Sequence, residues 1–203
     1  RYVYPLPQDG AVDSLKMVVG QRVIVGRIKP REVAEKIYEK AKDNGQRAGL
    51  VEEQRPNMFV NRVANVGPGE TVLIAIEYQA PVRQVAGESS LRLPLVVGPR
   101  YTPPHTLNSP KKIADAEVVT SSPIALKGNL NPVSINVNLA PGFSPSAIAS
   151  PYHRIDVQGS GIQRSIRLAD GTVPANRDFE LTWRAATAEP AVGLFRQRVD
   201  GRD

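Results

Sequence analysis

The sequence predicts an all-β fold, mainly an antiparallel β-sandwich, with one amphipathic α-helix near residues 31–43. Three observations support this prediction. Glycine and proline together make up 34 of the 203 residues (16 plus 18), a share that suits short strands joined by tight turns. Most apolar segments alternate with polar residues, in the two-residue period of a half-buried strand. A single segment follows the helical period instead.

The first hairpin is predicted over residues 15–28, with its turn at Gly20-Gln21. Apolar residues alternate on both sides of this turn, and each set shares one face of its strand. The two sets are Leu15, Met17 and Val19 before the turn, and Val23 and Val25 after it.

The helix is expected to begin at Pro30, because a proline in the first turn loses no hydrogen bond. Val33 and Ile37 are one turn apart on its apolar stripe, and we expect both to be buried against a sheet. Asn44-Gly45 supplies the left-handed stop that helices favour. The polar face carries charges of both signs, which argues against a helix that lies on a membrane.

Further strands are predicted along the chain. Residues 58–63 and 71–78 form an expected hairpin around Gly67-Pro68-Gly69, and Pro94 places the strand 91–97 at a sheet edge or a bulge. Beyond a proline-rich connector near residues 102–110, short strands continue at 116–120, 133–139, 154–158, 162–168 and 178–184.

Charge and composition exclude several classes of function. The formal net charge of +6 is spread out: residues 1–100 carry 15 Lys and Arg against 11 Asp and Glu, and residues 101–203 carry 11 against 9. Nucleic-acid binding is not expected, because the cations are not gathered on one element with aromatic residues between them. Attraction to anionic polysaccharide or lipid headgroups stays open beside a plain solvated surface. The chain has no cysteine and no apolar run of the length that a membrane span needs.

No catalytic, cofactor-binding or metal-ligating residue is predicted. His105 and His153 are the two histidines, and neither has a catalytic partner at a recognisable spacing. Glu52-Glu53 is interpreted as a salt-bridged surface rather than as an acid/base pair. The Gly-Ser-Gly segment at residues 159–161 lacks the remaining residues of a phosphate-binding loop and is interpreted as a hairpin turn.

Arg55 is expected to have a structural role. A guanidinium group can satisfy several acceptors where loops cross, so we expect it to pair with backbone carbonyls or with Glu52, Glu53 or Glu77. Replacing Arg55 by lysine is therefore expected to lower the melting temperature.

A series of landmarks runs in order over about residues 2–103. It comprises Tyr2-Val3-Tyr4-Pro5-Leu6-Pro7, Ala11-Val12-Asp13, Gly20-Gln21-Arg22-Val23-Ile24, Ala34-Glu35-Lys36-Ile37-Tyr38, Ala41, Leu50-Val51-Glu52, Gln54-Arg55-Pro56-Asn57-Met58-Phe59, Val63-Ala64-Asn65-Val66-Gly67-Pro68-Gly69-Glu70, Ile76-Glu77-Tyr78, and Leu93-Pro94 with Pro99-Arg100-Tyr101. In this order and spacing, the segment resembles the vault protein inter-alpha-trypsin (VIT) domain of inter-alpha-trypsin inhibitor heavy chains.

The resemblance implies that residues 1–103 form an all-β VIT domain with one helix and no known enzymatic activity. In this family a von Willebrand type A domain, which carries a metal-dependent ligand site, usually follows. Residues 104–203 are interpreted as the β-rich continuation toward such a domain, since residues 178–184 are similar to the segment that commonly precedes it. Family members have about two further strands ahead of the Tyr-Pro-Leu-Pro segment, so we expect an open sheet edge here.

The leading hypothesis is a non-catalytic structural or adhesion module of an exported or cell-surface protein. The resemblance and the composition rich in Ala, Val, Arg and Pro favour a bacterial envelope protein, in which the module scaffolds an adjacent von Willebrand type A domain. Other expected partners are an extracellular protein or an anionic polysaccharide, and no cofactor is expected. Two alternatives remain: a cytoplasmic assembly module, as in vault-associated proteins, and a domain that binds polysaccharide through its dispersed arginines.

Overall fold

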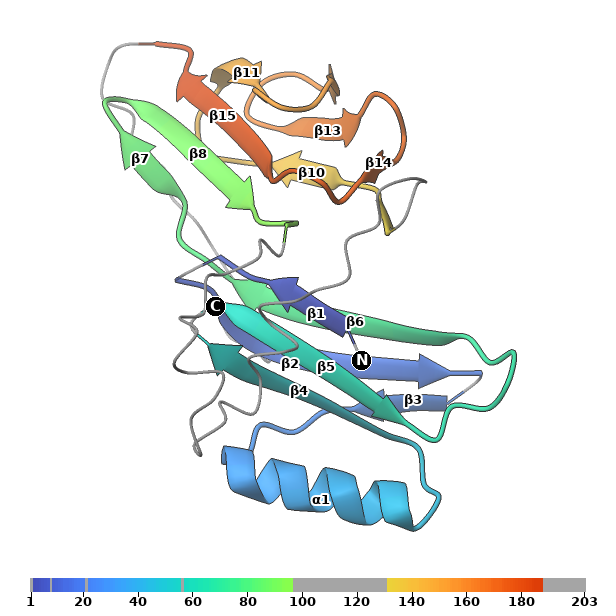
Figure 1. Ribbon diagram of the computed structural model, residues 1–203. Coiled ribbons are helices and arrows are strands. Elements are labelled where there is room, and N and C mark those ends of the chain that lie inside the picture. The colour runs from blue at the N-terminus through green and yellow to red at the C-terminus, as the bar shows by residue number, and fades with distance from the viewer. Residues whose placement is uncertain (1, 8, 21, 56, 97–130, 188–203) are drawn as a thin grey trace, which may run out of the picture. The chain divides into compact units, whose positions relative to one another are not determined.

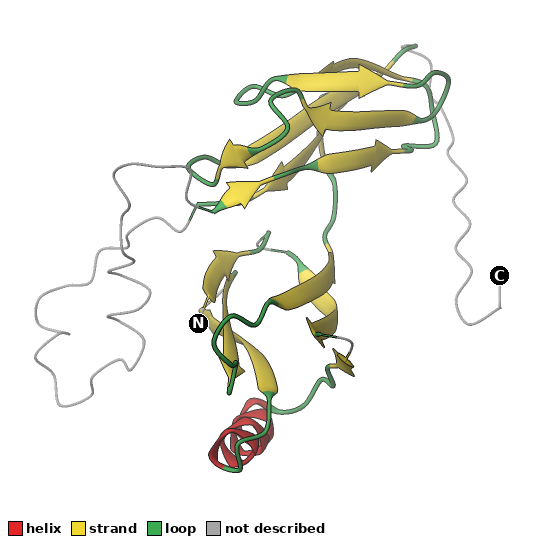
Figure 2. Cartoon of the chain, turned by 90° about the vertical axis from the view of Figure 1, so that its right-hand side faces the viewer, coloured by secondary structure: helices red, strands yellow, loops and turns green. Residues whose placement is uncertain are grey.

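The computed structural model describes residues 2–7, 9–20, 22–55, 57–96 and 131–187 of the 203-residue chain. These residues form two compact units. The N-terminal unit holds the described residues up to Pro81 together with Val96, and the C-terminal unit holds Val82–Leu95 together with residues 131–187. Antiparallel strands dominate both units, and α1 (Arg31–Asp43) is the one helix among the described residues (Figure 2). The predicted all-β class is confirmed.

The N-terminal unit contains two three-stranded antiparallel sheets with the strand orders β1-β5-β4 and β3-β2-β6 (Figure 1). Gly49 lies at the contact between them, because a Cβ at this position would be 3.3 Å from Met17 Sδ. The strands are β1 (Tyr2–Pro5), β2 (Ala11–Val19), β3 (Arg22–Val25), β4 (Ala48–Arg55), β5 (Met58–Ala64) and β6 (Val72–Gln79).

Strands β2 and β3 form the expected hairpin, with a two-residue turn after Val19. Gly20 has a φ of +59°, a left-handed conformation that glycine adopts without steric cost. Met17 and Val19 are buried on the inner face of the sheet. Val23 and Val25 share a face, as expected, but this is the outer face of the sheet.

The bounds of α1 agree with the sequence. The helix starts directly after Pro30, which has the extended backbone of a helix cap, and it ends at Asp43, with Asn44 as its C-cap. Gly45 follows with a φ of +70°, the left-handed conformation expected for a helix stop.

The buried stripe of α1 differs from the expected one. Val33 and Ile37 are 45% and 50% exposed, so the prediction that both are buried is wrong. Tyr38 is the buried residue of the helix, and it packs against Leu50 and Ala64 of the sheet β1-β5-β4. A tyrosine ring buries more apolar area than a valine or isoleucine side chain, so the helix is turned to place that ring against the sheet.

Strands β5 and β6 do not form the expected hairpin. β5 pairs with β1 and β4, whereas β6 pairs with β2 in the other sheet, so the segment at residues 65–71 passes from one sheet to the other. Pro5 is tolerated in β1 because this strand lies at a sheet edge, where one side needs no backbone donor.

The C-terminal unit contains the sheets β11-β15-β8-β7 and β10-β13-β12 and the pair β14-β9. β8 lies between two strands and ends before Pro94, so the expected edge strand or bulge at this proline is wrong. The strands predicted near residues 133–139, 154–158, 162–168 and 178–184 are present, and 116–120 lies outside the described residues. The bounds are β7 (Arg83–Val85), β8 (Glu88–Leu93), β9 (Pro132–Val133), β10 (Asn136–Leu139), β11 (Pro145–Ala149), β12 (Ile155–Gln158), β13 (Arg164–Leu168), β14 (Val173–Pro174) and β15 (Phe179–Ala185).

The two larger sheets of the C-terminal unit pack face to face as a β-sandwich. Phe179, Leu181 and Trp183 alternate along β15 and share one buried cluster with Ile166 and Leu168 of β13. β8 joins this unit by pairing with β15, although it precedes the expected domain boundary at residues 103–104. That boundary itself lies outside the described residues and stays a prediction.

Candidate functional site

A cluster of charged side chains lies between α1 and the sheet β1-β5-β4. Glu52 of β4 is buried, with 4% of its side chain exposed, and Arg62 of β5 donates to Glu52 Oε2 at 2.7 Å. Arg31 Nε lies 3.4 Å from the other carboxylate oxygen. Arg62 also reaches the helix, with Nη2 3.1 Å from Glu35 Oε1 and Nη1 3.6 Å from Glu39 Oε1. We refer to these five residues as the helix–sheet ion cluster.

The contacts in this cluster stabilise the fold. The Arg62 guanidinium lies over the Tyr38 ring, 5.1 Å from its centroid, which adds a cation–π contact. Burial alone lowers the pKa of Arg62, but its hydrogen bond to Glu35 and the charge of Glu52 raise that pKa overall. Arg62 therefore offsets the repulsion between Glu35 and Glu39, which are neighbours one turn apart on α1. Lys42 also pairs with Glu39, at 2.7 Å. The three carboxylates all face a guanidinium and are not arranged as an acid/base pair.

The two residues of the Glu52-Glu53 pair lie in different environments. Glu52 is salt-bridged, as expected, but it is buried beside Arg62 rather than on the surface. Glu53 is exposed and accepts a hydrogen bond from the backbone N–H of Asn57 at 3.1 Å. The side chain of Arg55 lies outside the described part of the structure, so its expected partners stay a prediction.

His153 packs against the core of the C-terminal unit. Its ring centroid lies 5.7 Å from that of Phe179, and both ring nitrogens are buried without a hydrogen-bond partner in the described chain. Burial lowers the pKa of His153, and the nearby positive charge of Arg177 lowers it further. The imidazole is therefore neutral near pH 7 and acts as a packing group. His105 lies outside the described residues.

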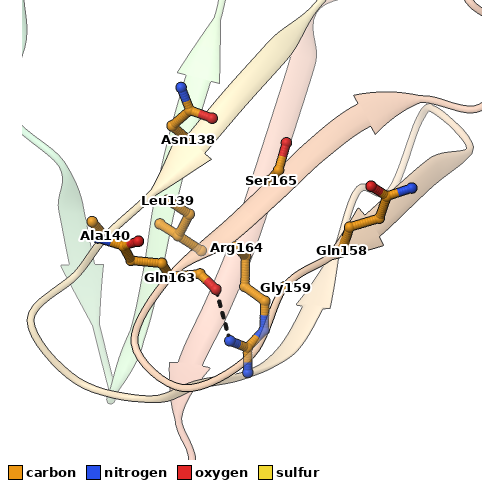
Figure 3. A pocket seen from close by; sticks show the side chains of 8 residues that line it. All are labelled: Asn138, Leu139, Ala140, Gln158, Gly159, Gln163, Arg164 and Ser165. Carbon is orange, nitrogen blue, oxygen red and sulfur yellow. Dashed lines mark hydrogen bonds between the residues drawn. The ribbon is translucent and has the colours of Figure 1, made fainter.

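Residues 159–161 form the expected turn between the antiparallel strands β12 and β13. Arg164 holds this turn by donating from Nη1 to the carbonyl oxygen of Gly161 at 2.7 Å. It also donates to the carbonyl oxygen of Gln163 at 2.9 Å (Figure 3). A pocket of about 460 Å³ lies beside it. The pocket is lined by Asn138, Leu139, Ala140, Gln158, Gly159, Gln163, Arg164 and Ser165.

A row of polar side chains crosses this pocket. Asn138, Ser165 and Gln158 lie directly opposite one another on β10, β13 and β12. Their neighbours Leu139 and Ile166 are buried, so the polar row stands on the face that points away from the core. Two amides and a hydroxyl in one row offer both hydrogen-bond donors and acceptors to a neutral polar ligand such as a sugar.

The outer face of the sheet β3-β2-β6 carries an apolar row in the N-terminal unit. Val23, Val18 and Leu73 lie directly opposite one another on β3, β2 and β6. Val23 and Leu73 are 61% and 62% exposed to solvent. The next row on this face contains Val25, which is 64% exposed, opposite Lys16. We refer to these five residues as the outer β3 face.

The charges on this sheet are few and partly paired. Glu77 accepts a hydrogen bond from the Ser14 hydroxyl at 2.8 Å and pairs with Lys16 at 3.3 Å, and both interactions lower the pKa of Glu77. Exposed aliphatic groups that are bordered by polar residues are typical of surfaces that contact another macromolecule. Sequence reasoning identified the hairpin but not the exposure of this face.

The described residues contain neither a group of metal ligands nor a membrane-spanning helix. In residues 2–96 and 131–187, apart from the gaps noted above, no three His, Asp or Glu side chains gather as a possible metal site. No helix in the described part of the chain is long and apolar enough to cross a lipid bilayer.

Comparisons with known proteins find a family model that matches the first 78 residues. The family model of the vault protein inter-alpha-trypsin domain matches residues 1–78. Protein mono-ADP-ribosyltransferase PARP4 of Mus musculus is 35% identical over 78 residues, which are 38% of this chain and 4% of that protein. The von Willebrand factor A domain-containing protein 5A is 32% identical over 104 residues in Rattus norvegicus and 31% over 103 residues in Homo sapiens. Each match covers 49% of this chain, and 12% or 13% of the relative.

The chain thus spans a small fraction of the length of each of these relatives. The resemblance of the N-terminal landmarks to a VIT domain is confirmed for residues 1–78.

Proposed function

We propose that this chain is a non-catalytic interaction module that supports a neighbouring von Willebrand type A domain of the same protein. The single observation that carries the proposal is the outer β3 face, an exposed apolar surface within the segment that matches the VIT family. Relatives named for a von Willebrand factor A domain are 32% and 31% identical over 104 and 103 residues of this chain, which supports the identity of the neighbour.

The ionic chemistry of the N-terminal unit supports the non-catalytic part of the proposal. Glu35, Glu39 and Glu52 are held by Arg62, and Glu77 is held by Lys16. A carboxylate held in an ion pair stabilises the fold and is not placed to exchange a proton with a substrate, as a general acid or base must. The surfaces, rather than a catalytic centre, are therefore the part of this unit that is open to a partner.

The proposal extends to location and biological role. We place the module in an exported or cell-surface protein with an adhesive function, related to the inter-alpha-trypsin inhibitor heavy chains and of bacterial origin. The resemblance of the landmarks and the amino-acid composition support this placement. A cytoplasmic assembly role is the alternative. Determining the full reading frame separates the two, because an export signal supports the first and a cytoplasmic catalytic domain supports the second.

Binding between the separate domains tests the proposal. The chain and the von Willebrand type A domain from its own reading frame are purified, and their affinity is measured by calorimetry. We expect a measurable complex that weakens when Val23 and Leu73 are both replaced by serine, whereas serine at the exposed Val157 and Ile162 of the C-terminal unit leaves it unchanged. A reading frame without such a domain, or a complex that is indifferent to the Val23 and Leu73 changes, contradicts the proposal.

A second candidate function is polysaccharide binding by the C-terminal unit. The row Asn138–Ser165–Gln158 in its pocket supports this candidate, because two amides and a hydroxyl can bind sugar hydroxyl groups (Figure 3). A glycan array at 50 mM and 200 mM NaCl tests it. Binding that resists salt and is lost in Asn138→Ala/Gln158→Ala supports this pocket. Binding that disappears at the higher salt instead indicates dispersed arginines.

A further inference from the structure

The outer edge of β3 is unpaired within the described residues. In the sheet order β3-β2-β6, β3 pairs with β2 on one side and with no described strand on the other. All four of its residues are exposed, including those on the inner face of the sheet. An unpaired edge presents backbone N–H and C=O groups that can form a ladder with another strand.

The alternation of hydrogen-bonded and non-bonded pairs in the hairpin shows which backbone N–H and C=O groups of β3 point away from β2. The Gly26 N–H donates to the Leu15 carbonyl at 2.7 Å, so these two residues are a hydrogen-bonded pair. Such pairs alternate with non-bonded pairs along an antiparallel ladder. Val25 and Val23 are therefore at non-bonded positions relative to β2, and their N–H and C=O groups point to the open side.

The side chains at this edge are apolar on both faces. Val23 and Val25 lie on the outer face, and Ile24, which belongs to the inner face, is still 39% exposed. A strand added to β3 would cover all three of these aliphatic side chains. It would also extend the row Val23–Val18–Leu73 by one more residue on the outer face.

The edge is basic at both of its ends. Arg22 precedes the three aliphatic residues, and Arg27 and Lys29 follow them, while no acidic residue occurs between residues 14 and 31 of the sequence. None of these three cations forms an ion pair within the described residues. A second copy of the chain that paired edge to edge would bring like charges together, which is unfavourable. The charge pattern instead complements an acidic segment.

We propose that the open edge of β3 binds an extended acidic segment of another protein by strand addition, with apolar side chains at its centre and carboxylates at its ends. The proposal rests on the interaction role proposed above and adds to the von Willebrand type A domain a second partner, which binds at the edge of the same sheet. The ladder bonds to Val23 and Val25 supply affinity that does not depend on sequence, and the flanking cations select for acidic ends.

A short synthetic peptide is the probe. It has blocked ends and the sequence Glu-Glu-Val-Ile-Val-Glu-Glu, so that in an antiparallel ladder its apolar centre lies opposite Val23–Val25 and its acids lie near Arg22 and Arg27. Two companions serve as controls: one with lysine in place of glutamate, and one with both valine amides N-methylated to remove ladder donors. Affinity for the whole chain is measured by calorimetry, and the contact is mapped by amide chemical shifts.

We expect the acidic peptide to bind, with the largest shifts at the amides of Val23 and Val25, and each control peptide to bind at least about tenfold more weakly. The variant Arg22→Glu/Arg27→Glu should lose at least about tenfold in affinity for the acidic peptide and gain affinity for the lysine peptide. The matched variant Arg83→Glu/Arg167→Glu, which changes the net charge equally at exposed sites of the C-terminal unit, should bind as the unchanged chain does.

A proline at residue 25 tests whether the peptide binds by backbone pairing or by nonspecific hydrophobic contact. Because the Val25 N–H points outward, Val25→Pro removes a ladder donor without removing a bond to β2. We expect this variant to keep its circular dichroism spectrum and to lose peptide binding at least about fivefold.

Four results overturn the proposal. The first two are equal affinity for the acidic and the N-methylated peptides, and no binding at millimolar peptide. The third is that the chain binds phosphatidylserine vesicles through Val23 and Val25 instead of binding the peptide. The fourth is that light scattering shows dimers which Val25→Pro abolishes. The proposed function is tested separately by the affinity for the von Willebrand type A domain. A chain that binds this domain but not the peptide refutes the strand-addition inference alone, and a chain that binds neither refutes both.

Discussion

Replacing Arg62 by leucine should destabilise the N-terminal unit strongly. The change removes the cation that lies 2.7 Å from Glu52 Oε2, while the Glu52 carboxylate stays 4% exposed. It also removes the cation–π contact with Tyr38 and the guanidinium that Glu35 and Glu39 share, although Glu39 keeps its ion pair with Lys42. Leucine fills much of the same volume, so the expected loss is mainly electrostatic.

The magnitude follows from the burial of Glu52. Removing one partner of a buried ion pair costs about 3–5 kcal/mol, because the other charge remains desolvated. Arg31 stays 3.4 Å from Glu52 Oε1 and offsets part of this cost, although its own side chain is 57% exposed. We therefore expect the free energy of unfolding to fall by about 3 kcal/mol. In the double variant Glu52→Leu/Arg62→Leu, where neither charge remains, most of this loss should be recovered.

Urea unfolding can follow the two units with different signals. Helix α1 belongs to the N-terminal unit, so circular dichroism at 222 nm follows that unit, whereas Trp183 fluorescence follows the C-terminal unit. With a urea dependence of about 2 kcal/mol per M, the dichroism midpoint should fall by about 1.5 M in Arg62→Leu.

The matched control is Arg184→Leu, which removes an ion pair with Glu88 at the surface of the C-terminal unit. Both of its side chains are about half exposed, so the cost should stay below about 1 kcal/mol. The reasoning is refuted if Arg62→Leu costs no more than this control, or if the double variant is as unstable as Arg62→Leu alone.

Three further changes test other parts of the fold. Burial lowers the pKa of His153, so as the pH falls this histidine is protonated in the unfolded chain before it is protonated in the folded chain. The stability that the neutral imidazole contributes is therefore present above about pH 6.5 and is lost as the pH falls toward the lower folded pKa. His153→Phe should flatten the decrease of the Trp-monitored urea midpoint between pH 7.5 and 5.5. Gly159→Ala should lower the melting temperature more than Gly161→Ala, since a Cβ at residue 159 would lie 2.9 Å from a carbonyl oxygen whereas residue 161 faces open space; equal effects would contradict this. Ile37→Lys should change the stability by less than about 0.5 kcal/mol and Tyr38→Ala should cost about 3 kcal/mol, as measured by the dichroism midpoint.

Features that depend on neighbouring residues could be predicted from the sequence. The turn after Val19 and the end of α1 at Gly45 each depend on a glycine that adopts positive φ, and the chain signals both locally. Strand partners depend on distant residues. Nothing near Met58 distinguishes a hairpin with β6 from pairing with β1 and β4, and nothing near Leu91 indicates that β8 pairs with β15. Alternation reveals that a strand exists and which side chains share a face, but not its neighbour.

The exposure of the outer β3 face could not be predicted from alternation alone, but the position of one lysine does indicate it. The alternation of Val23 and Val25 indicates one shared face, but an alternating pattern does not state which face is covered. Lys16 indicates which face of the hairpin is exposed. In a hairpin with a two-residue turn it lies opposite Val25, and a lysine is almost never fully buried. The face that contains Lys16 therefore had to point to solvent, and the valines beside it had to be exposed. A hairpin register combined with the position of one charged residue is thus enough to identify an exposed apolar face, and the cations at both ends of β3 then specify the charge of the partner that can cover it.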